Sequence, residues 1–292
     1  MNFKEKILFI IFITLITSLL ITFEGRTGWN LAMVSGTGAE HQIRRFRNVR
    51  IHSKYQNSFE ALADLKEEKV DVVIMDYLSI LNIINQPGEN QLKLVGGRLT
   101  QTKGRVAFKA DDNELRQKFN HALSELIESG TYRNLCLKYF GIDQSENIYR
   151  TSRDIRVKSG DDSWDKIQKK GSIRFGMFFN NPPFFYYDQQ NQPTGFEVEL
   201  ARAICKLWGI ECHFIDVNSC DPIEGLIAQA YDGLWTGIND ISSFRKKIEF
   251  SEAYSNSGAQ MVVKTDSTIT GPDTFEGRFS AFQRLFRRRT FR

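Results

Sequence analysis

The sequence is poor in the residues from which most catalytic and metal sites are built. Its 292 residues include four histidines and four cysteines. The histidines are scattered through the chain. No Ser-His-Asp arrangement, P-loop or cysteine group with the two-to-four-residue spacing of a structural zinc site occurs. We therefore expect no enzyme activity, no cofactor and no resident metal.

The chain also lacks a basic surface apart from its last residues. The formal charge is +4, from 39 Lys and Arg against 35 Asp and Glu. Segment 279–292 contains five arginines and no acid, and without it 34 basic residues face 35 acidic ones. Because the body is not basic, we expect no nucleic-acid partner. The basic tail lies either on an anionic membrane face or is a frayed end.

Long apolar runs are absent except for one. Residues 7–23 carry no charge and follow Lys4 and Lys6. A basic start and an apolar run are typical of a secretory signal, but no A-x-A cleavage site follows. We predict that 1–23 is a signal peptide or a signal anchor. The rest of the chain is then periplasmic or extracytoplasmic, and anchoring to the inner membrane through 7–23 stays open.

The cysteines agree with export. Cys205 and Cys212 are separated by six residues that include a glycine. A helix ending near Trp208 and a strand starting near Ile210 would bring the two thiols together, which predicts a disulfide in an oxidising compartment. His213 adjoins Cys212, but the cysteine spacing argues against zinc.

What the sequence does contain is alternating short strands and helices. Apolar residues make up 41% and charged residues 25%, an ordinary globular mixture. The pattern predicts an α/β fold with a largely parallel sheet, helices on both faces, and ligand binding beyond the carboxyl ends of the strands. The expected strands include 30–34, 70–75, 106–109, 172–178 and 213–217, and the expected helices include 58–65, 111–127, 164–170 and 196–208. Segment 142–162 is polar and without periodicity, so we interpret it as a linker.

Motifs in both α/β segments resemble one known family. The second segment contains Gly-Ser-Ile-Arg-Phe-Gly at 171–176, Pro-Pro-Phe at 182–184, Thr-Gly-Phe-Glu-Val-Glu-Leu at 194–200, Ser-Ser-Phe-Arg at 242–245 and Phe-Ser-Glu-Ala-Tyr at 250–254. The first contains Ser-Gly-Thr-Gly-Ala-Glu at 35–40, Val-Asp-Val-Val-Ile-Met-Asp at 70–76 and Gly-Thr-Tyr at 130–132. Together they resemble bacterial extracellular solute-binding proteins of family 3, the polar amino-acid receptors of ABC importers. The resemblance implies a type II periplasmic-binding-protein fold, in which a hinge joins two α/β lobes.

The two halves stand in reversed order relative to that family. Segment 24–141 resembles the second half, which is lobe II and the C-terminal part of lobe I, and 163–278 resembles the first half, lobe I. Thr-Phe-Glu-Gly-Arg occurs at both 22–26 and 274–278, and reading from Arg278 into Thr27 restores a family-like passage. The chain is then a circular permutant or a piece of a tandem array. The cut would fall in one connection between the lobes, leaving the other, near Thr100–Phe108, to hold the hinge alone.

The resemblance also implies a binding site for an amino acid. Arg245 matches the family's carboxylate partner, with the Ser242 hydroxyl three residues earlier, and Asp76 matches the acid that binds the ammonium group. Two alternatives stay open: Arg245 lies in a solvated charge run, and Asp76 is a helix N-cap.

Further candidates follow from the same match. Gly36 and Thr37 open a helix whose free N–H groups favour a carboxylate, and Phe184 lines the apolar part of the pocket. Asn181 occupies the place of an aromatic residue often stacked on ligand. Asn239 faces the site if the alignment slips by one residue at Asp240. A carboxylate at the start of the helix near 197–199 is a candidate partner for a basic side chain.

The predicted function is non-catalytic capture of a small polar ligand, an amino acid, by hinge closure, with the membrane permease of an ABC importer as partner. Three alternatives are a sensory module of a signalling receptor, an enzyme resembling periplasmic cyclohexadienyl dehydratases, and a non-functional rearranged fragment.

Overall fold

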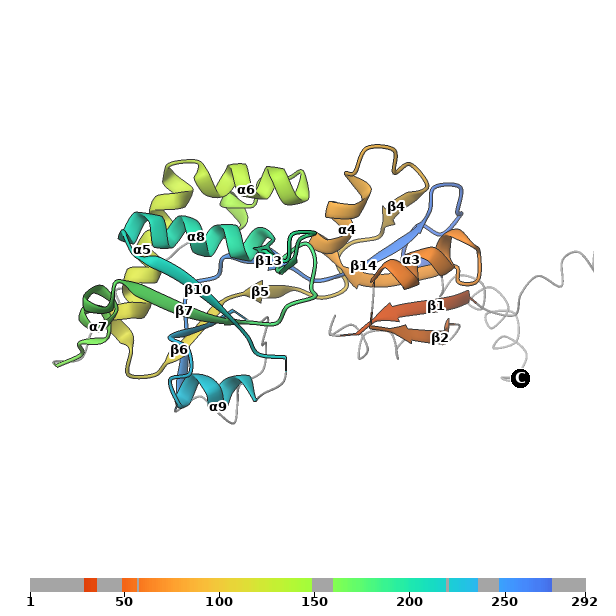
Figure 1. Cartoon of the computed structure of the whole chain (residues 1–292). Coiled ribbons are helices and arrows are strands. Elements are labelled where there is room, and N and C mark those ends of the chain that lie inside the picture. The colour runs from red at the N-terminus through yellow and green to blue at the C-terminus, as the bar shows by residue number, and fades with distance from the viewer. Residues whose placement is uncertain are drawn as a thin grey trace, which may run out of the picture.

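Two β-sheets form two lobes in the computed structural model of the chain (Figure 1). The structure describes residues 29–35, 49–56, 58–148, 160–218, 221–235 and 247–274. The predicted signal segment, the basic tail and residues 149–159 of the predicted linker lie outside these ranges. Within them, no helix has the length and apolar character needed to cross a bilayer.

Lobe II is built on a five-stranded sheet of order β2-β1-β3-β14-β4. Strands β1, β2 and β3 are parallel, and β14 runs antiparallel to both β3 and β4. Alternate residues of β1 pack into different cores, Leu31 and Met33 into one and Ala32 and Val34 into the other, because a strand points successive side chains to opposite faces. Helices α3 and α4 cover the second face. The bounds are β1 (Trp29–Val34), β2 (Val49–Tyr55), α3 (Ser58–Lys66), β3 (Val72–Asp76), α4 (Tyr77–Ile84), β4 (Leu92–Val95) and β14 (Ala259–Lys264).

Lobe I has a sheet of the same plan, with order β10-β7-β11-β6-β12. Strands β10, β7 and β11 are parallel, and β6 is antiparallel to β11 and β12. Helices α5, α6 and α8 gather on one face and α9 lies on the other (Figure 1). The bounds are β6 (Val106–Lys109), α5 (Asn113–Glu128), α6 (Thr131–Phe140), α7 (Ser163–Lys170), β7 (Ser172–Met177), β8 (Tyr186–Tyr187), β9 (Pro193–Thr194), α8 (Phe196–Trp208), β10 (Glu211–Asp216), α9 (Pro222–Ile227), β11 (Gly233–Trp235) and β12 (Ile248–Phe250).

Each sheet takes its reversed strand from the other half of the sequence. β6 belongs to 24–141 but lies in lobe I, as the resemblance implied. β14 belongs to 163–278 but lies in lobe II, so this segment supplies a strand to the second lobe as well. The reason is that the chain leaves lobe I after β12, which places the next strand in the opposite lobe.

Two connections join the lobes. β5 (Thr102–Gly104) and β13 (Ser255–Ser257) pair antiparallel between the sheets (Figure 1). The prediction that one connection near 100–108 holds the hinge alone is therefore wrong. Gly258 follows β13 with φ +149°, and a Cβ there would lie 2.0 Å from the carbonyl oxygen of Thr100. Only glycine permits this approach of the two backbones.

The ends of the predicted linker are packed against lobe I and the hinge. Gln144 is buried, its Nε2 donates to the carbonyl of Asn256, and its Oε1 accepts from the Asn256 N–H, both at 3.1 Å. At the other end, Asp161 accepts a hydrogen bond from the N–H of Glu114 at 2.9 Å, which satisfies a free donor in the first turn of α5. The polar side chains at both ends of the predicted linker thus form hydrogen bonds with the folded lobe and the hinge strand.

Cys205 and Cys212 lie together as the sequence predicts, at the end of α8 and in β10. The turn between them has Gly209 in the left-handed region, with φ +68°. Both cysteines are free thiols in this structure, so the predicted disulfide is not formed in it. A hydrogen bond with Cys212, together with burial, raises the pKa of Cys205 above its ordinary value. The proximity that a disulfide needs is present.

Candidate ligand-binding site

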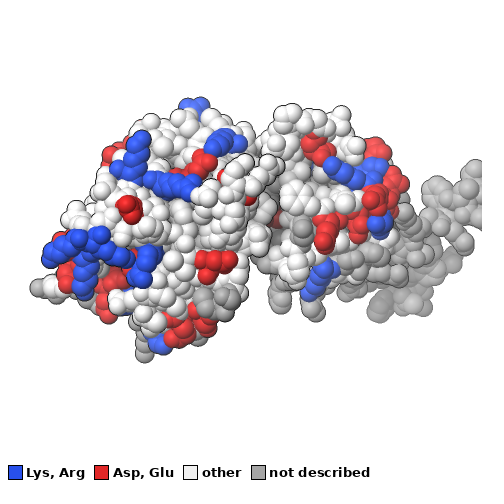
Figure 2. Space-filling model, in the orientation of Figure 1, with Lys and Arg blue, Asp and Glu red and all other residues white. Residues whose placement is uncertain are grey.

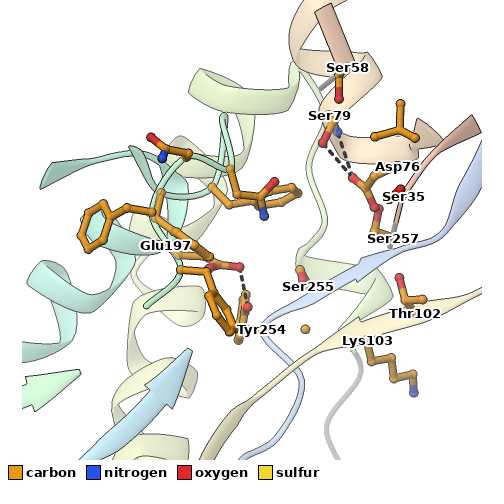
Figure 3. Close-up of a pocket in the computed structure, with 18 of the residues that line it drawn as sticks. Ser35, Ser58, Asp76, Ser79, Thr102, Lys103, Glu197, Tyr254, Ser255 and Ser257 are labelled. Carbon is orange, nitrogen blue, oxygen red and sulfur yellow. Dashed lines mark hydrogen bonds between the residues drawn. The ribbon is translucent and has the colours of Figure 1, made fainter. Parts of the chain in front are cut away.

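A cavity of about 770 Å³ lies between the lobes. Its walls come from the carboxyl ends of β1, β3 and β7, from the start of α8 and from both hinge strands, so the expected place beyond the strand ends is where the cavity lies. The lining residues include Ser35, Ser58, Asp76, Ser79, Thr102, Lys103, Asn181, Phe184, Glu197, Tyr254, Ser255 and Ser257. Figure 3 shows Glu197 and Tyr254 on one side and Asp76, Ser79 and Ser257 on the other.

Asp76 lies at the end of β3 and is the N-cap of α4. Its Oδ1 accepts from the Ser79 N–H at 3.0 Å, and its Oδ2 accepts from the Ser257 hydroxyl at 2.6 Å. Burial raises the pKa of Asp76, although these hydrogen bonds act in the opposite direction. The N-cap alternative is therefore correct, and the same carboxylate also lines the cavity. Because Ser257 belongs to β13, the hinge strand helps to orient this carboxylate.

Glu197 stands across the cavity, in the first turn of α8, and is 5% exposed. The Tyr254 hydroxyl donates to its Oε1, while Oε2 is buried and has no hydrogen-bond partner among the described residues. Burial, together with the negative charge of Asp76, raises the pKa of Glu197 from 4.5 to about 8, although the hydrogen bond from Tyr254 acts in the opposite direction.

Backbone contacts hold Glu197 beside the aromatic side of the cavity. The Glu197 N–H donates to the carbonyl of Phe184 at 2.9 Å. Gly195 precedes α8 with φ +121°, and a Cβ there would lie 2.3 Å from the same carbonyl oxygen. The glycine thus permits the loop that carries Phe184 to press against the helix start.

Aromatic rings and a tight turn complete the lobe I wall. Phe179 stacks on Tyr187, with ring centroids 4.3 Å apart, and meets Phe185 edge-on. The backbone of Asn181 donates to the Phe185 carbonyl at 3.0 Å and accepts from the Phe184 N–H at 2.9 Å. This turn leaves the Asn181 side chain exposed at the cavity.

The structure brings three of the eight predicted ligand-binding residues to one cavity: Asp76, Asn181 and Phe184. The other five lie outside the described residues, namely Gly36, Thr37, Asn239, Ser242 and Arg245. Sequence reasoning missed the hydroxyl groups of Thr102, Ser255 and Ser257. Ser255 and Ser257 alternate in the short strand β13, whereas Thr102 begins β5. Both signals are too weak to notice without knowing that these strands form the hinge.

Comparison with known protein families finds one match. Residues 173–289 match the sequence model of bacterial extracellular solute-binding proteins, family 3. Over this stretch the chain is similar to that family. The match continues past residue 278 into the segment that we interpreted as a basic tail. With its two α/β lobes and paired hinge strands, the chain has the type II periplasmic-binding-protein fold.

Two curated proteins are similar to this chain over part of its length. ABC transporter arginine-binding protein 1 of Escherichia coli K12 is 30% identical over 101 residues, 35% of this chain and 42% of the relative. L-cystine-binding protein TcyJ of the same strain is 28% identical over 116 residues, 39% of this chain and 44% of the relative. The chain thus spans less than half the length of these relatives. Among solved structures, the arginine-bound form of domain 1 from TmArgBP shows 25% identity and a TM-score of 0.29, covering 41% of this chain and 98% of that one.

Proposed function

We propose that this protein captures an amino acid by closing its two lobes over the cavity between them. The observation that carries the proposal is that both lobes and both hinge strands supply the cavity wall. A ligand that touches both walls is bound more tightly when the lobes are closed, so binding shifts the population towards the closed form. The names of the relatives, which refer to arginine and cystine binding, support an amino acid as ligand.

The proposed ligand contacts divide between the lobes. Asp76 in lobe II accepts the ligand ammonium group, and Phe184 and Asn181 line the opposite wall. For the ligand carboxylate we propose the Arg245 guanidinium, assisted by the Ser242 hydroxyl and the backbone N–H groups at Gly36 and Thr37. Asn239 is a further polar candidate on the same segment as Arg245.

We also propose that the protein is exported and delivers its ligand to the membrane permease of an ABC importer. The apolar segment 7–23 supports export, either as a cleaved signal or as an anchor. On the face shown in Figure 2, acidic and basic side chains are interspersed over both lobes. Such a surface suits an extracytoplasmic receptor better than a nucleic-acid-binding protein.

The reversed order of the halves is best explained by circular permutation. Support comes from the sheets, because each has three parallel strands followed by one reversed strand from the other half. All parts of both lobes are then present once, with the segment around 149–159 joining them. A piece of a tandem array would have the same order within this chain. Mass measurement of the protein purified from its own cell would distinguish the two, since an array predicts a much larger product.

The test is calorimetry of the full chain against the twenty amino acids, together with small-angle X-ray scattering. We expect one or a few amino acids to bind and to reduce the radius of gyration. Asp76→Ala and Arg245→Ala should each abolish binding while the circular dichroism spectrum is kept. If a folded protein gives heat with none of the twenty, capture of an amino acid is wrong. If binding survives in both variants, the proposed contacts are wrong.

A further inference from the structure

We infer that the contact between α4 and the end of α6 is a second pivot of the hinge and confines the lobes to a single rotation as they close. This rests on the proposed function, because it assumes that ligand binding closes the lobes. The contact joins lobe II to lobe I through Asn82, Asn85, Tyr139 and Phe140, and none of these four residues lines the cavity. Figure 1 shows α4 and α6 side by side above the hinge strands β5 and β13.

The two faces of α4 pack into different lobes. Leu78 and Leu81 are buried in the apolar core that contains α5, α6 and α8 of lobe I, although α4 follows a strand of the lobe II sheet. Asn82 and Asn85 continue this face, because residues three, four and seven positions apart lie on one side of a helix. Ile80 lies on the other face and is buried in the core of lobe II. One helix thus connects the two cores.

Specific hydrogen bonds fix α4 to the end of α6. Asn82 Nδ2 donates to the carbonyl of Tyr139 at 2.7 Å. Asn85 Nδ2 donates to the carbonyl of Phe140, also at 2.7 Å. Both carbonyls belong to the last turn of α6, where the helix itself supplies no donor. Gly141 follows with φ +68°, and a Cβ there would lie 2.4 Å from Asn85 Nδ2, so the glycine permits this approach.

Both sides of this contact are attached to the hinge strand β13. At the start of α4, the Tyr77 N–H donates to the carbonyl of Gly258, which directly follows β13, at 2.8 Å. Beyond the end of α6, the Gln144 side chain pairs with the backbone of Asn256 in β13. The contact therefore lies close to the axis about which the lobes rotate. Because a rigid rotation moves an atom in proportion to its distance from the axis, the contact persists while the cavity closes.

A second point of contact changes which motions the hinge allows. A pair of strands can twist as well as bend, whereas a hinge held at two separate points turns about the line that joins them. Rotation about any other line would lengthen or bend the hydrogen bonds of Asn82 and Asn85, and hydrogen bonds weaken steeply when they are bent. The α4–α6 contact thus leaves one rotation free and opposes the others.

Each side of the pivot is also directly connected to one wall of the cavity. On lobe II, α4 begins at its N-cap Asp76, which lines the cavity. On lobe I, the ring of Phe140 contacts the ring of Phe184 on the opposite wall, with centroids 6.0 Å apart. The α4–α6 contact therefore determines how Asp76 and Phe184 approach each other. A hinge that brings the two walls together in one arrangement spends less of the binding free energy on ordering them.

The first experiment joins α4 covalently to the end of α6. Asn85→Cys combined with Gly141→Cys in the full chain places two thiols where the side chains meet, which is the proximity that a disulfide needs. The protein is titrated reduced and oxidised with each of the twenty amino acids, and wild type treated in the same way controls for the native cysteines. We expect the oxidised protein to bind at least as tightly as the reduced one. A tenfold or greater loss of affinity on oxidation would overturn the inference, because the contact would then have to break on closure.

The second experiment removes the contact without altering the cavity wall. Asn82→Ala combined with Asn85→Ala should lower the affinity for the amino acid that binds by roughly threefold to tenfold. It should also broaden the distance distribution of the ligand-free protein in X-ray scattering. Gln86→Ala, just beyond the end of α4, is the matched control and should change neither.

The outcomes separate the pivot from the proposed function. Unchanged affinity and unchanged scattering in the double alanine variant, with its thermal transition intact, would overturn the inference and leave amino-acid capture intact. If wild type binds none of the twenty amino acids, the proposed function is wrong. Scattering of the ligand-free variants tests the pivot in that case too, because it requires no ligand.

Discussion

Replacing Glu197 with glutamine should stabilise the ligand-free protein, and the gain should grow with pH. In the folded chain the pKa of Glu197 is about 8, because the carboxyl is buried and faces Asp76, whereas its ordinary value is 4.5. Between these two values the folded state holds a proton that the unfolded state releases. The folded state therefore binds more protons, and linkage requires stability to fall as pH rises through this window. Glutamine cannot ionise and avoids this loss.

The magnitude follows from the width of the window. Each unit of pKa difference corresponds to about 1.4 kcal/mol, so a difference of roughly 3.5 units gives a full effect on the order of 5 kcal/mol. Near pH 4.5 the two proteins should have nearly the same free energy of unfolding. Above pH 8 the variant should be the more stable by several kcal/mol. Other groups that titrate, Asp76 included, are common to both proteins and largely cancel in the difference.

The assay is urea denaturation of both proteins, without ligand, at four pH values from 5 to 8.5. Glu199→Gln serves as control, since Glu199 is only partly buried and pairs with Lys138. A difference between wild type and Glu197→Gln that does not change with pH would refute the reasoning. So would a variant that is less stable throughout, because the carboxyl would then contribute through its hydrogen bond with Tyr254 more than it costs through burial.

Three further changes test other parts of the structure. Gly258→Ala places a methyl group 2.0 Å from the Thr100 carbonyl oxygen. We therefore expect the free energy of unfolding to fall by roughly 1–3 kcal/mol or more and the radius of gyration to increase. An unchanged X-ray scattering curve would contradict this. Gln144→Ala removes two hydrogen bonds to the hinge strand β13 and should lower the free energy of unfolding by about 1–2 kcal/mol. An unchanged urea midpoint would show that these hydrogen bonds do not stabilise the fold. If Cys205 and Cys212 form a disulfide, oxidation should lower the number of thiols that react with a thiol reagent by two. Cys205→Ser should then lower the free energy of unfolding of the oxidised protein by roughly 2–3 kcal/mol. An unchanged number of reactive thiols after oxidation would exclude the disulfide.

Local elements of the fold are predictable from the sequence where the apolar pattern is strong. The strand at 30–34 and the helix ending at Trp208 match β1 and α8 closely, because each is apolar at the period of its element. The lobe to which β14 belongs is not predictable in this way. Its neighbours β3 and β4 lie more than 150 residues away, and only the path of the chain through the hinge brings them together.

The site shows a similar division. Asp76 follows a buried apolar strand, so both its capping role and its place at the cavity could be expected from sequence. Gln144 could not, because a single glutamine in a polar, non-periodic stretch has the same appearance in a linker as in a buried contact. Among the described residues, Oε2 of Glu197 has no hydrogen-bond partner, and this could not be predicted either, because it depends on how Tyr254, far along the chain, approaches the start of α8.

The exchange of strands between the lobes has a consequence for how the protein unfolds. β14 is interior to one sheet and β6 is interior to the other, and each comes from the half of the chain that forms most of the opposite lobe. Unfolding one lobe would therefore remove a central strand from its sheet. The segments that continue from that strand into the other lobe would then lose their attachment. The lobes are separate in shape but interlocked in connectivity. We therefore expect heat or denaturant to melt both in one cooperative step, so that the flexibility needed for capture is confined to the hinge.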